Sequence, residues 1–156
     1  MTRRAGKAAG GIAAAVLAGA AAFIAPWEGR ELSAYRDIVG VWTICYGHTG
    51  GVKAGQVATE AQCRSMLAQD VETHWRALAQ CMPTLPEAPV PVQVALTSWA
   101  FNLGPRCDST LVRKGNARDW RGACDELLKW NRAGGRVVRG LTLRREAERE
   151  LCLSGL

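Results

Sequence analysis

The sequence has 156 residues, enough for one domain with a single core and too few for a second full domain. Its 20 Lys and Arg residues outnumber 14 acidic residues and give a net charge of +6, which favours acidic partners such as nucleic acid, anionic lipid or cell wall. Nucleic acid is disfavoured because the basic residues are interspersed with acids and form no unbroken stripe with stacking aromatics.

The N-terminal segment combines a basic start with a long uncharged run. Residues 1–7 contain Arg3, Arg4 and Lys7, and residues 8–27 hold ten alanines, three glycines and no charge. Basic residues before an apolar run direct the following chain across a membrane, and a helix of this length reaches about 30 Å, the thickness of the hydrocarbon core. The few strongly apolar residues contribute only about −1.5 to −3 kcal/mol to insertion, so we expect a marginal hold on the bilayer.

Three interpretations of this segment are open. It is a signal peptide cleaved at small residues within 18–22, an uncleaved anchor weak enough to leave the membrane, or a buried Ala-rich helix of a soluble protein. The basic start disfavours the buried helix. Taken alone, the segment favours the cleaved signal peptide.

A small sheet followed by helices is predicted next. Residues 33–56 are rich in Val, Ile, Tyr, Trp and Thr and are interrupted by glycines, which predicts an antiparallel hairpin or a three-stranded sheet. A capping-box pattern at its start and apolar residues at helical spacing predict a helix over 59–79. A proline-rich connector then leads to a largely apolar, central helix over Val92–Leu103, begun by Pro91.

The last third of the chain predicts further helices. Asn116 is the expected N-cap of a helix that carries Trp120 and Cys124, and Thr142 is the expected N-cap of the last helix. Between them, the pair Gly134-Gly135 is interpreted as a chain break. The whole pattern predicts an α+β fold, with a small antiparallel sheet near the N-terminus beside a mainly helical lobe.

Two carboxylates and a hydroxyl follow the apolar segment. Asp37 lies nine residues after Glu28, and Thr43 lies six residues further, with Gly40 permitting a turn between the last two. If residues 38–40 form a hairpin turn, Asp37 and Thr43 face one cleft and Glu28 enters it from a helix end. Such a trio suits glycosidic cleavage, in which one carboxyl group protonates the leaving oxygen and the other activates water. The alternative is that these acids are solvated turn residues.

These residues belong to a longer motif. The pattern E-G-x(7)-D-x(2)-G-x(2)-T-x-C-x-G-H-T, from Glu28 to Thr49, closely resembles the catalytic motif of the T-even phage type of lysozyme, glycoside hydrolase family 24. The segment from Cys45 to Gly50 is similar to the signal-arrest-release endolysins of lambdoid phages. The resemblance continues over about residues 25–154, through Phe101–Gly104, Ser109–Leu111, Gly122–Cys124, Trp130, Gly140–Leu141, Arg144–Glu146 and Cys152.

The resemblance implies a lysozyme-like fold and hydrolysis of the β-1,4 bond between N-acetylmuramic acid and N-acetylglucosamine in peptidoglycan. It makes Glu28 the general acid, and Asp37 with Thr43 the pair that places water on the opposite face, which predicts inversion. Asn102 is expected to line the cleft and Arg144 to orient the catalytic glutamate. We also expect Trp42 to stack on sugar. No metal and no cofactor is expected.

The resemblance also changes the interpretation of the N-terminal segment. It implies a signal-arrest-release segment over residues 1–27 and a muramidase domain over 28–156. The host Sec machinery would export the chain uncleaved, residues 8–27 would hold it on the periplasmic face of the inner membrane of a Gram-negative host, and release would free it into the periplasm. While the segment lies in lipid, Glu28 cannot face Asp37, so the tether silences the enzyme. Residues 1–44 contain no cysteine, which disfavours activation by disulfide exchange.

The six cysteines indicate an oxidising compartment. Zinc is disfavoured, because the short Cys45–His48 spacing has no second close cysteine pair and the chain holds one other histidine, His74. Six cysteines permit 15 pairings. Our hypothesis joins elements adjacent along the chain and pairs Cys45 with Cys63, Cys81 with Cys107, and Cys124 with Cys152.

Three alternatives to a released lysozyme remain at this stage. A secreted endolysin with a cleaved signal peptide would use the same site without a switch. A lytic transglycosylase would cut the same bond without water. A wall-binding module of the same architecture would adsorb to peptidoglycan and not cleave it.

Overall fold

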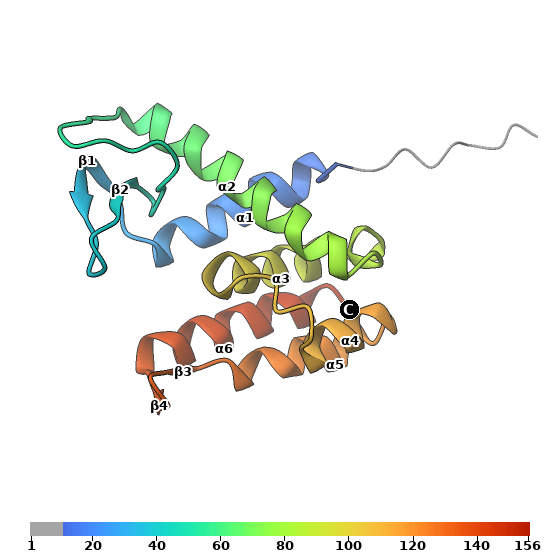
Figure 1. Ribbon diagram of the computed structural model, residues 1–156. Coiled ribbons are helices and arrows are strands. Elements are labelled where there is room, and N and C mark those ends of the chain that lie inside the picture. Colours follow the sequence, from blue (N-terminus) through green and yellow to red (C-terminus); the bar gives the residue numbers. More distant parts are fainter. Residues whose placement is uncertain (1–10) are drawn as a thin grey trace, which may run out of the picture.

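The computed structural model describes residues 11–156 and has two small antiparallel sheets beside a mainly helical lobe (Figure 1). The helices and strands are α1 (Ala14–Ile24), β1 (Glu31–Arg36), β2 (Trp42–Cys45), α2 (Glu60–Cys81), α3 (Val90–Leu103), α4 (Thr110–Asn116), α5 (Trp120–Glu126), β3 (Arg132–Ala133), β4 (Arg136–Val137) and α6 (Arg139–Ser154). Short 3-10 turns lie at η1 (Ala25–Trp27), η2 (Leu85–Glu87) and η3 (Leu127–Lys129). This arrangement confirms the predicted α+β class.

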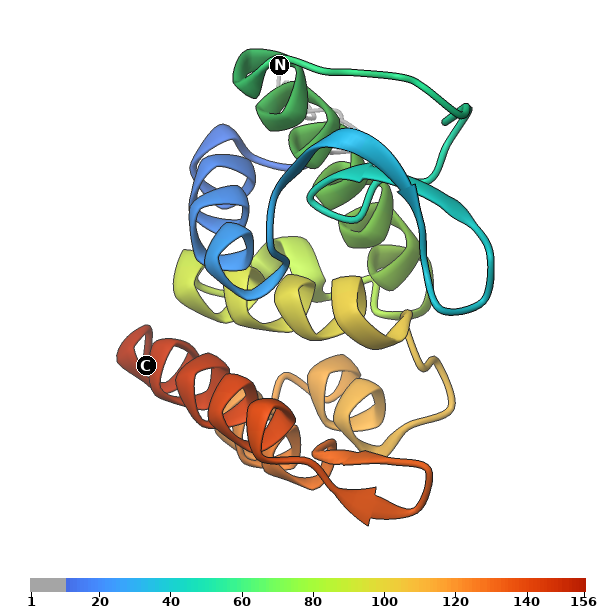
Figure 2. The same cartoon turned by 90° about the vertical axis from the view of Figure 1, so that its left-hand side faces the viewer.

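Helix α3 is the buried centre of the helical lobe. It packs against α1, α2 and α6, and Figure 1 and Figure 2 both show it between the α1–α2 side of the molecule and α6. Burial on several sides explains its nearly continuous apolar sequence. The helix begins at Val90, two residues before the predicted start, and Pro91 lies in its first turn, where the missing N–H breaks no helical hydrogen bond.

Helix α2 confirms the predicted capping box. The Thr59 hydroxyl accepts a hydrogen bond from the Gln62 N–H at 3.1 Å, and the Gln62 side chain accepts from the Thr59 N–H at 2.8 Å. The helix therefore begins where the sequence predicted and extends two residues further than expected. Its buried face consists of the residues Cys63, Leu67, Val71, Trp75 and Leu78.

The first sheet is a two-stranded hairpin. Strands β1 and β2 are antiparallel with Tyr35 opposite Thr43, and the pairing is irregular between Glu31 and Tyr35. An isolated bridge joins Ser33 to Val57, so the third strand considered from the sequence is reduced to one contact.

Two predicted helix starts are wrong. Asn116 ends α4, and Asp119 provides the side-chain cap of α5. Helix α6 begins at Arg139, and the hydroxyl of Thr142, inside that helix, accepts a hydrogen bond from the Asn131 side chain. In both cases the polar side chain makes a contact with another segment of the chain instead of capping a helix.

Helix α4 and the β3–β4 hairpin were not predicted. Helix α4 has only seven residues and begins after Ser109, whose hydroxyl accepts from the Val112 N–H. The pair interpreted as a chain break, Gly134 and Gly135, is the turn of the β3–β4 hairpin, with φ angles of +56° and +76°. Both angles lie in the left-handed region that favours glycine in such turns.

The disulfide hypothesis is confirmed in all three pairs. Cys45–Cys63 joins β2 to α2, Cys81–Cys107 joins the end of α2 to the α3–α4 connection, and Cys124–Cys152 joins α5 to α6. Bridges of this kind typically stabilise a fold by about 2–4 kcal/mol each.

Helix α1 is part of the core. Val16, Ala20 and Ile24 follow one another at four-residue spacing and have no exposed surface, and the helix contacts α2 and α3. Within residues 11–156, no helix has both the length and the apolar character that a membrane crossing requires. The structure thus shows residues 14–24 docked on the domain, and the first part of the predicted membrane stretch, residues 8–10, lies outside the described residues.

Candidate active site

Glu28 lies where α1 leads into the first sheet. Three residues of η1 separate it from the end of α1, and its N–H donates to the Ala25 carbonyl at 3.3 Å. Its side chain is 22% exposed and receives a hydrogen bond from Arg144 of α6, whose Nη1 donates to Glu28 Oε1 at 2.6 Å. Glu28 is therefore carried by α1 and held by α6.

Two depressions share Glu28 as a wall, with volumes of about 460 Å³ and 420 Å³. The larger, which we call the cleft, is lined by Glu28, Tyr46, Gly47, His48, Thr49, Gly50, Asp70, His74, Phe101 and Asn102. The smaller is lined by Glu28, Gly29, Arg30, Glu31 and Tyr35. A carboxyl group placed between two depressions can reach a bond in the middle of an extended substrate that fills both.

Asp37 and Thr43 are held together through Val41 at the end of the β1–β2 hairpin. Asp37 Oδ1 accepts from the Val41 N–H at 2.8 Å and from the Val39 N–H at 2.9 Å. The Thr43 hydroxyl donates to the Val41 carbonyl at 3.0 Å. Gly40, with a φ of +83°, completes this turn. The structure thus brings Asp37 and Thr43 together, but neither residue lines the two depressions beside Glu28.

Of the two remaining residues predicted to contact the substrate, one lines the cleft and the other does not. Asn102 lines the cleft, and its Oδ1 accepts from Arg145 Nη2 at 3.1 Å. Trp42 lies on β2 and does not line the cleft. The Arg36 guanidinium lies 5.1 Å from the centre of the Trp42 ring.

Among the residues that line the cleft, three side chains from the helices α2 and α3 were not predicted as site residues. Asp70 and His74 come from α2, one turn apart, and Phe101 comes from α3. The His74 and Phe101 rings are 4.8 Å apart between centroids, and His48 Nδ1 lies 2.8 Å from Asp70 Oδ2. The helical spacing of Asp70 and His74 is the one sequence signal for them, and it does not reveal which cleft they face.

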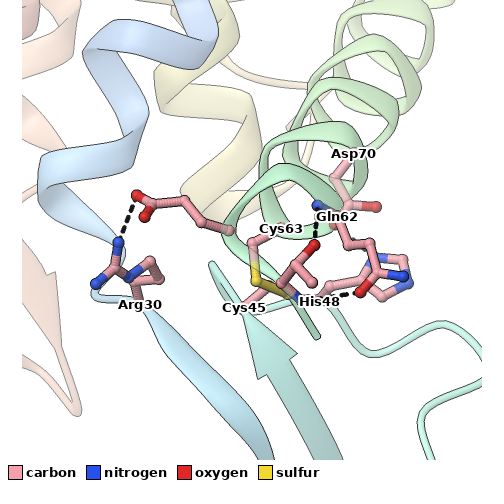
Figure 3. Close-up of a disulfide and its surroundings, with 8 residues drawn as sticks. Arg30, Cys45, His48, Gln62, Cys63 and Asp70 are labelled. Carbon is pink, nitrogen blue, oxygen red and sulfur yellow. Dashed lines mark hydrogen bonds and ion pairs between the residues drawn. A yellow bond between two sulfur atoms is a disulfide. The ribbon is translucent and has the colours of Figure 1, made fainter. Parts of the chain in front are cut away.

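Three contacts fasten the sheet side of the cleft to the first half of α2 (Figure 3). They are the Cys45–Cys63 disulfide, the His48–Asp70 pair, and an ion pair between Arg30 and Glu60 at the start of α2. Because these contacts join several points of the segment 30–48 to one helix, they fix the wall of the cleft that faces Glu28.

A buried ionic cluster lies behind Glu28. It consists of Arg144, Arg145 and Glu148 of α6 with Ser98 of α3, and all four side chains are buried. Burial raises the pKa of Glu148, against the opposing effect of Arg145 and of a hydrogen bond from Ser98. Burial likewise lowers the pKa of Arg145, against the opposing effect of Glu148.

Comparison with known proteins gives consistent matches. The phage lysozyme family model matches residues 25–148. The SAR-endolysin of Enterobacteria phage P21 is 43% identical over 131 residues, which cover 82% of this chain and 78% of that protein. The active form of the P1 phage endolysin Lyz has a TM-score of 0.79 at 26% identity, over 94% of this chain and 97% of that chain. Its secreted inactive form has a TM-score of 0.53 at 29% identity, over 74% and 81%.

The matched region contains the residues that build the cleft and its surroundings. It begins at Ala25, directly after α1 and three residues before Glu28, and includes Asp37, Thr43 and the α6 cluster up to Glu148. This chain therefore belongs to the phage lysozyme family and is a lysozyme-type glycosidase.

Proposed function

We propose that this protein is a phage endolysin that hydrolyses the β-1,4 bond between N-acetylmuramic acid and N-acetylglucosamine in the peptidoglycan of a Gram-negative host. The observation that carries the proposal is the Glu28 carboxyl, which stands between two depressions and is held by the buried Arg144. The endolysin names of the relatives and the net charge of +6, which suits an acidic cell wall, support it.

In the proposed reaction, Glu28 donates its proton to the glycosidic oxygen as the bond from that oxygen to the anomeric carbon breaks. Water attacks the same carbon from the opposite face and gives a proton to Asp37. Asp37 Oδ1 is engaged by the turn, so we assign Oδ2 to the water and the Thr43 hydroxyl to its positioning. A single displacement inverts the configuration, and it requires carboxyl groups about 6.5–9.5 Å apart.

Two further residues are proposed to contact the glycan. Asn102 lines the cleft and offers its side-chain amide to sugar hydroxyl or acetamido groups. The indole of Trp42 is the proposed stacking surface for a sugar ring, on the hairpin that also carries Asp37.

Activation is proposed to follow from the position of α1. While residues 8–27 lie in the bilayer, Glu28 is kept at the membrane surface, because only η1 separates it from α1. Release lets α1 dock on α2 and α3, which brings Glu28 to Arg144. The higher TM-score with the active form of the P1 endolysin than with its inactive form supports the interpretation that the docked arrangement is the active one.

The substitution Glu28→Gln tests the proposal. It removes the donated proton and keeps the shape of the side chain, so the rate of digestion of purified Gram-negative murein should fall by a factor of about 10³ or more, with an unchanged circular dichroism spectrum. Wild-type protein should clear chloroform-treated Gram-negative cells. A protein that only adsorbs to those cells is a wall-binding module, and products with anhydro-muramyl ends identify a transglycosylase.

A further inference from the structure

The proposed mechanism uses Arg144 but leaves the cluster behind it without a role. Arg144 Nε lies 3.3 Å from Glu148 Oε1, and Arg144 Nη2 lies 3.3 Å from the Ser98 hydroxyl oxygen. Its Nη1 reaches Glu28 on the other side. One guanidinium therefore connects a carboxyl group at the cleft with a carboxyl group that has no exposed surface.

Glu148 is itself surrounded by donors. The Ser98 hydroxyl donates to Oε1 at 2.6 Å, Arg145 Nη2 donates to Oε1 at 2.9 Å, and Arg145 Nε lies 2.8 Å from Oε2. An ionised carboxylate only accepts hydrogen bonds, so these contacts match a negatively charged Glu148 and oppose the effect of burial, which raises its pKa. The far end of the cluster is fixed at the cleft as well, because Arg145 donates to Asn102.

We infer that Glu148 is a positioning residue for the glycosidic reaction and acts on Glu28 through Arg144, an inference that rests on the proposed function. Its first effect is geometric. With Nε directed to Glu148 and Nη2 to Ser98, the guanidinium plane is fixed and Nη1 is directed at Glu28. This fixes the orientation of the carboxyl group that must reach the scissile oxygen.

Its second effect is electrostatic. A guanidinium beside a carboxyl group favours the ionised form of that group, whereas a general acid must carry a proton. The negative charge of Glu148 offsets the positive charge of Arg144, so the guanidinium orients the Glu28 carboxyl as part of a charge-balanced pair. The other ionisable groups near the pair lie on α6 and around the two depressions. They are Arg145 on α6, Tyr46, His48, Asp70 and His74 in the cleft, and Arg30, Glu31 and Tyr35 in the smaller depression.

The substitution Glu148→Gln separates these effects from a purely structural role. It keeps the size of the side chain and removes the charge. We expect kcat on purified murein to fall roughly 10- to 100-fold with KM changed by less than about threefold. The alkaline limb of the pH–rate profile should also move to lower pH, because the positive charge of Arg144 would then have no buried negative partner.

Glu126→Gln is the matched control. Glu126 is also buried and also pairs with two cations, Lys114 and Lys129, but it lies on α5 and does not line the cleft. This variant should unfold more easily and keep the wild-type kcat and pH–rate profile. A loss of kcat in Glu148→Gln without any movement of the alkaline limb would reduce Glu148 to a structural residue and overturn the inference, and so would wild-type kinetics.

If Glu148→Gln does not fold, Ser98→Ala tests instead whether the cluster positions Glu28. It removes one hydroxyl that contacts both Glu148 and Arg144 and leaves every charge in place. A lower kcat at unchanged KM supports the inference, and wild-type kcat overturns it. A wild-type protein that releases no sugar ends from murein contradicts the proposed function itself and removes the basis of this inference with it.

Discussion

Within residues 11–156, buried charged side chains lie in two separate places, the α6 cluster and Glu126, and Glu126 is the simpler case. Its Oε1 accepts from Lys114 Nζ at 2.7 Å and from Lys129 Nζ at 3.0 Å. The hydrogen bond from Lys114 is the main reason that the pKa of Glu126 is lowered, and burial opposes it. A carboxyl group whose pKa is lower in the folded state stabilises the fold above its unfolded pKa and loses that effect as the pH falls through the folded value.

Glu126 therefore predicts a pH dependence of stability. The difference in unfolding free energy between the wild type and Glu126→Gln should be constant from pH 7 to about pH 5.5 and should shrink as the pH falls below about 4, where unfolded glutamate becomes protonated. Urea unfolding followed by tryptophan fluorescence measures this difference. A difference that is the same at pH 7 and pH 3 would contradict the assignment of a charged Glu126.

Glu28, Asp37 and Thr43 were predictable as candidates because they lie close together in one motif. The sequence did not reveal Ser98 and Glu148, because they come from α3 and α6, and their meeting depends on how those helices pack. Asp70 and His74 were missed for the same reason, since helical spacing alone does not show which neighbour a helix faces.

At the scale of elements, α1 has one face that is buried against the domain and another that is exposed. Val16, Ala20 and Ile24 are buried, whereas Ala15, Ala18 and Ala22 are exposed on the docked helix. Changes on the exposed face therefore alter the affinity of the helix for lipid and leave its packing against α2 and α3 intact.

This separation gives a test of the proposed activation. Leucine at the three exposed positions of α1 adds roughly −1 to −2 kcal/mol of insertion free energy, so the variant should stay longer in the membrane fraction and lyse cells later. After detergent extraction and refolding it should digest murein at the wild-type rate. Serine at the same positions is the control and should shorten the membrane-bound stage. If the leucine variant digests murein equally well while still in the membrane, the tether does not silence the enzyme.

The success of sequence-based prediction also varied by element. Helix α2 was predicted nearly to its ends because its capping box uses only local hydrogen bonds. Helix α4 and the β3–β4 hairpin are too short for a periodic apolar pattern. Helix α4 is stabilised by packing against α5, whereas the strands of the hairpin are exposed and are held by their pairing across the Gly134-Gly135 turn. Asn116 and Thr142 misled the prediction because each satisfies a contact elsewhere in the fold.

At the scale of the whole molecule, the N-terminal segment and the enzymatic domain share one core. Val16, Ala20 and Ile24 belong to the same buried cluster as Trp75, Leu96 and Trp99. Cleavage at the small residues within 18–22 would remove Val16 and with it part of that core. The interpretation as a cleaved signal peptide, which the segment alone favoured, therefore conflicts with the packing.

The mass of the protein recovered from the periplasm distinguishes these interpretations. We expect the full-length chain, because buried residues of α1 contribute about 1.5–3 kcal/mol each when they are large and apolar. Mass spectrometry of protein from wild-type host cells measures this directly. A product that lacks about its first 20 residues would instead identify an ordinary signal peptide and an enzyme that is active without α1.

The three disulfides follow one another along the chain without overlapping, since the first cysteine pairs with the second, the third with the fourth and the fifth with the sixth: Cys45–Cys63, Cys81–Cys107 and Cys124–Cys152. If the chain is exported as proposed, its thiols emerge in that order. When each bridge closes before the next thiol emerges, a thiol meets only its native partner. We therefore expect oxidation in order of emergence to produce the native connectivity without an enzyme that reshuffles mispaired bridges.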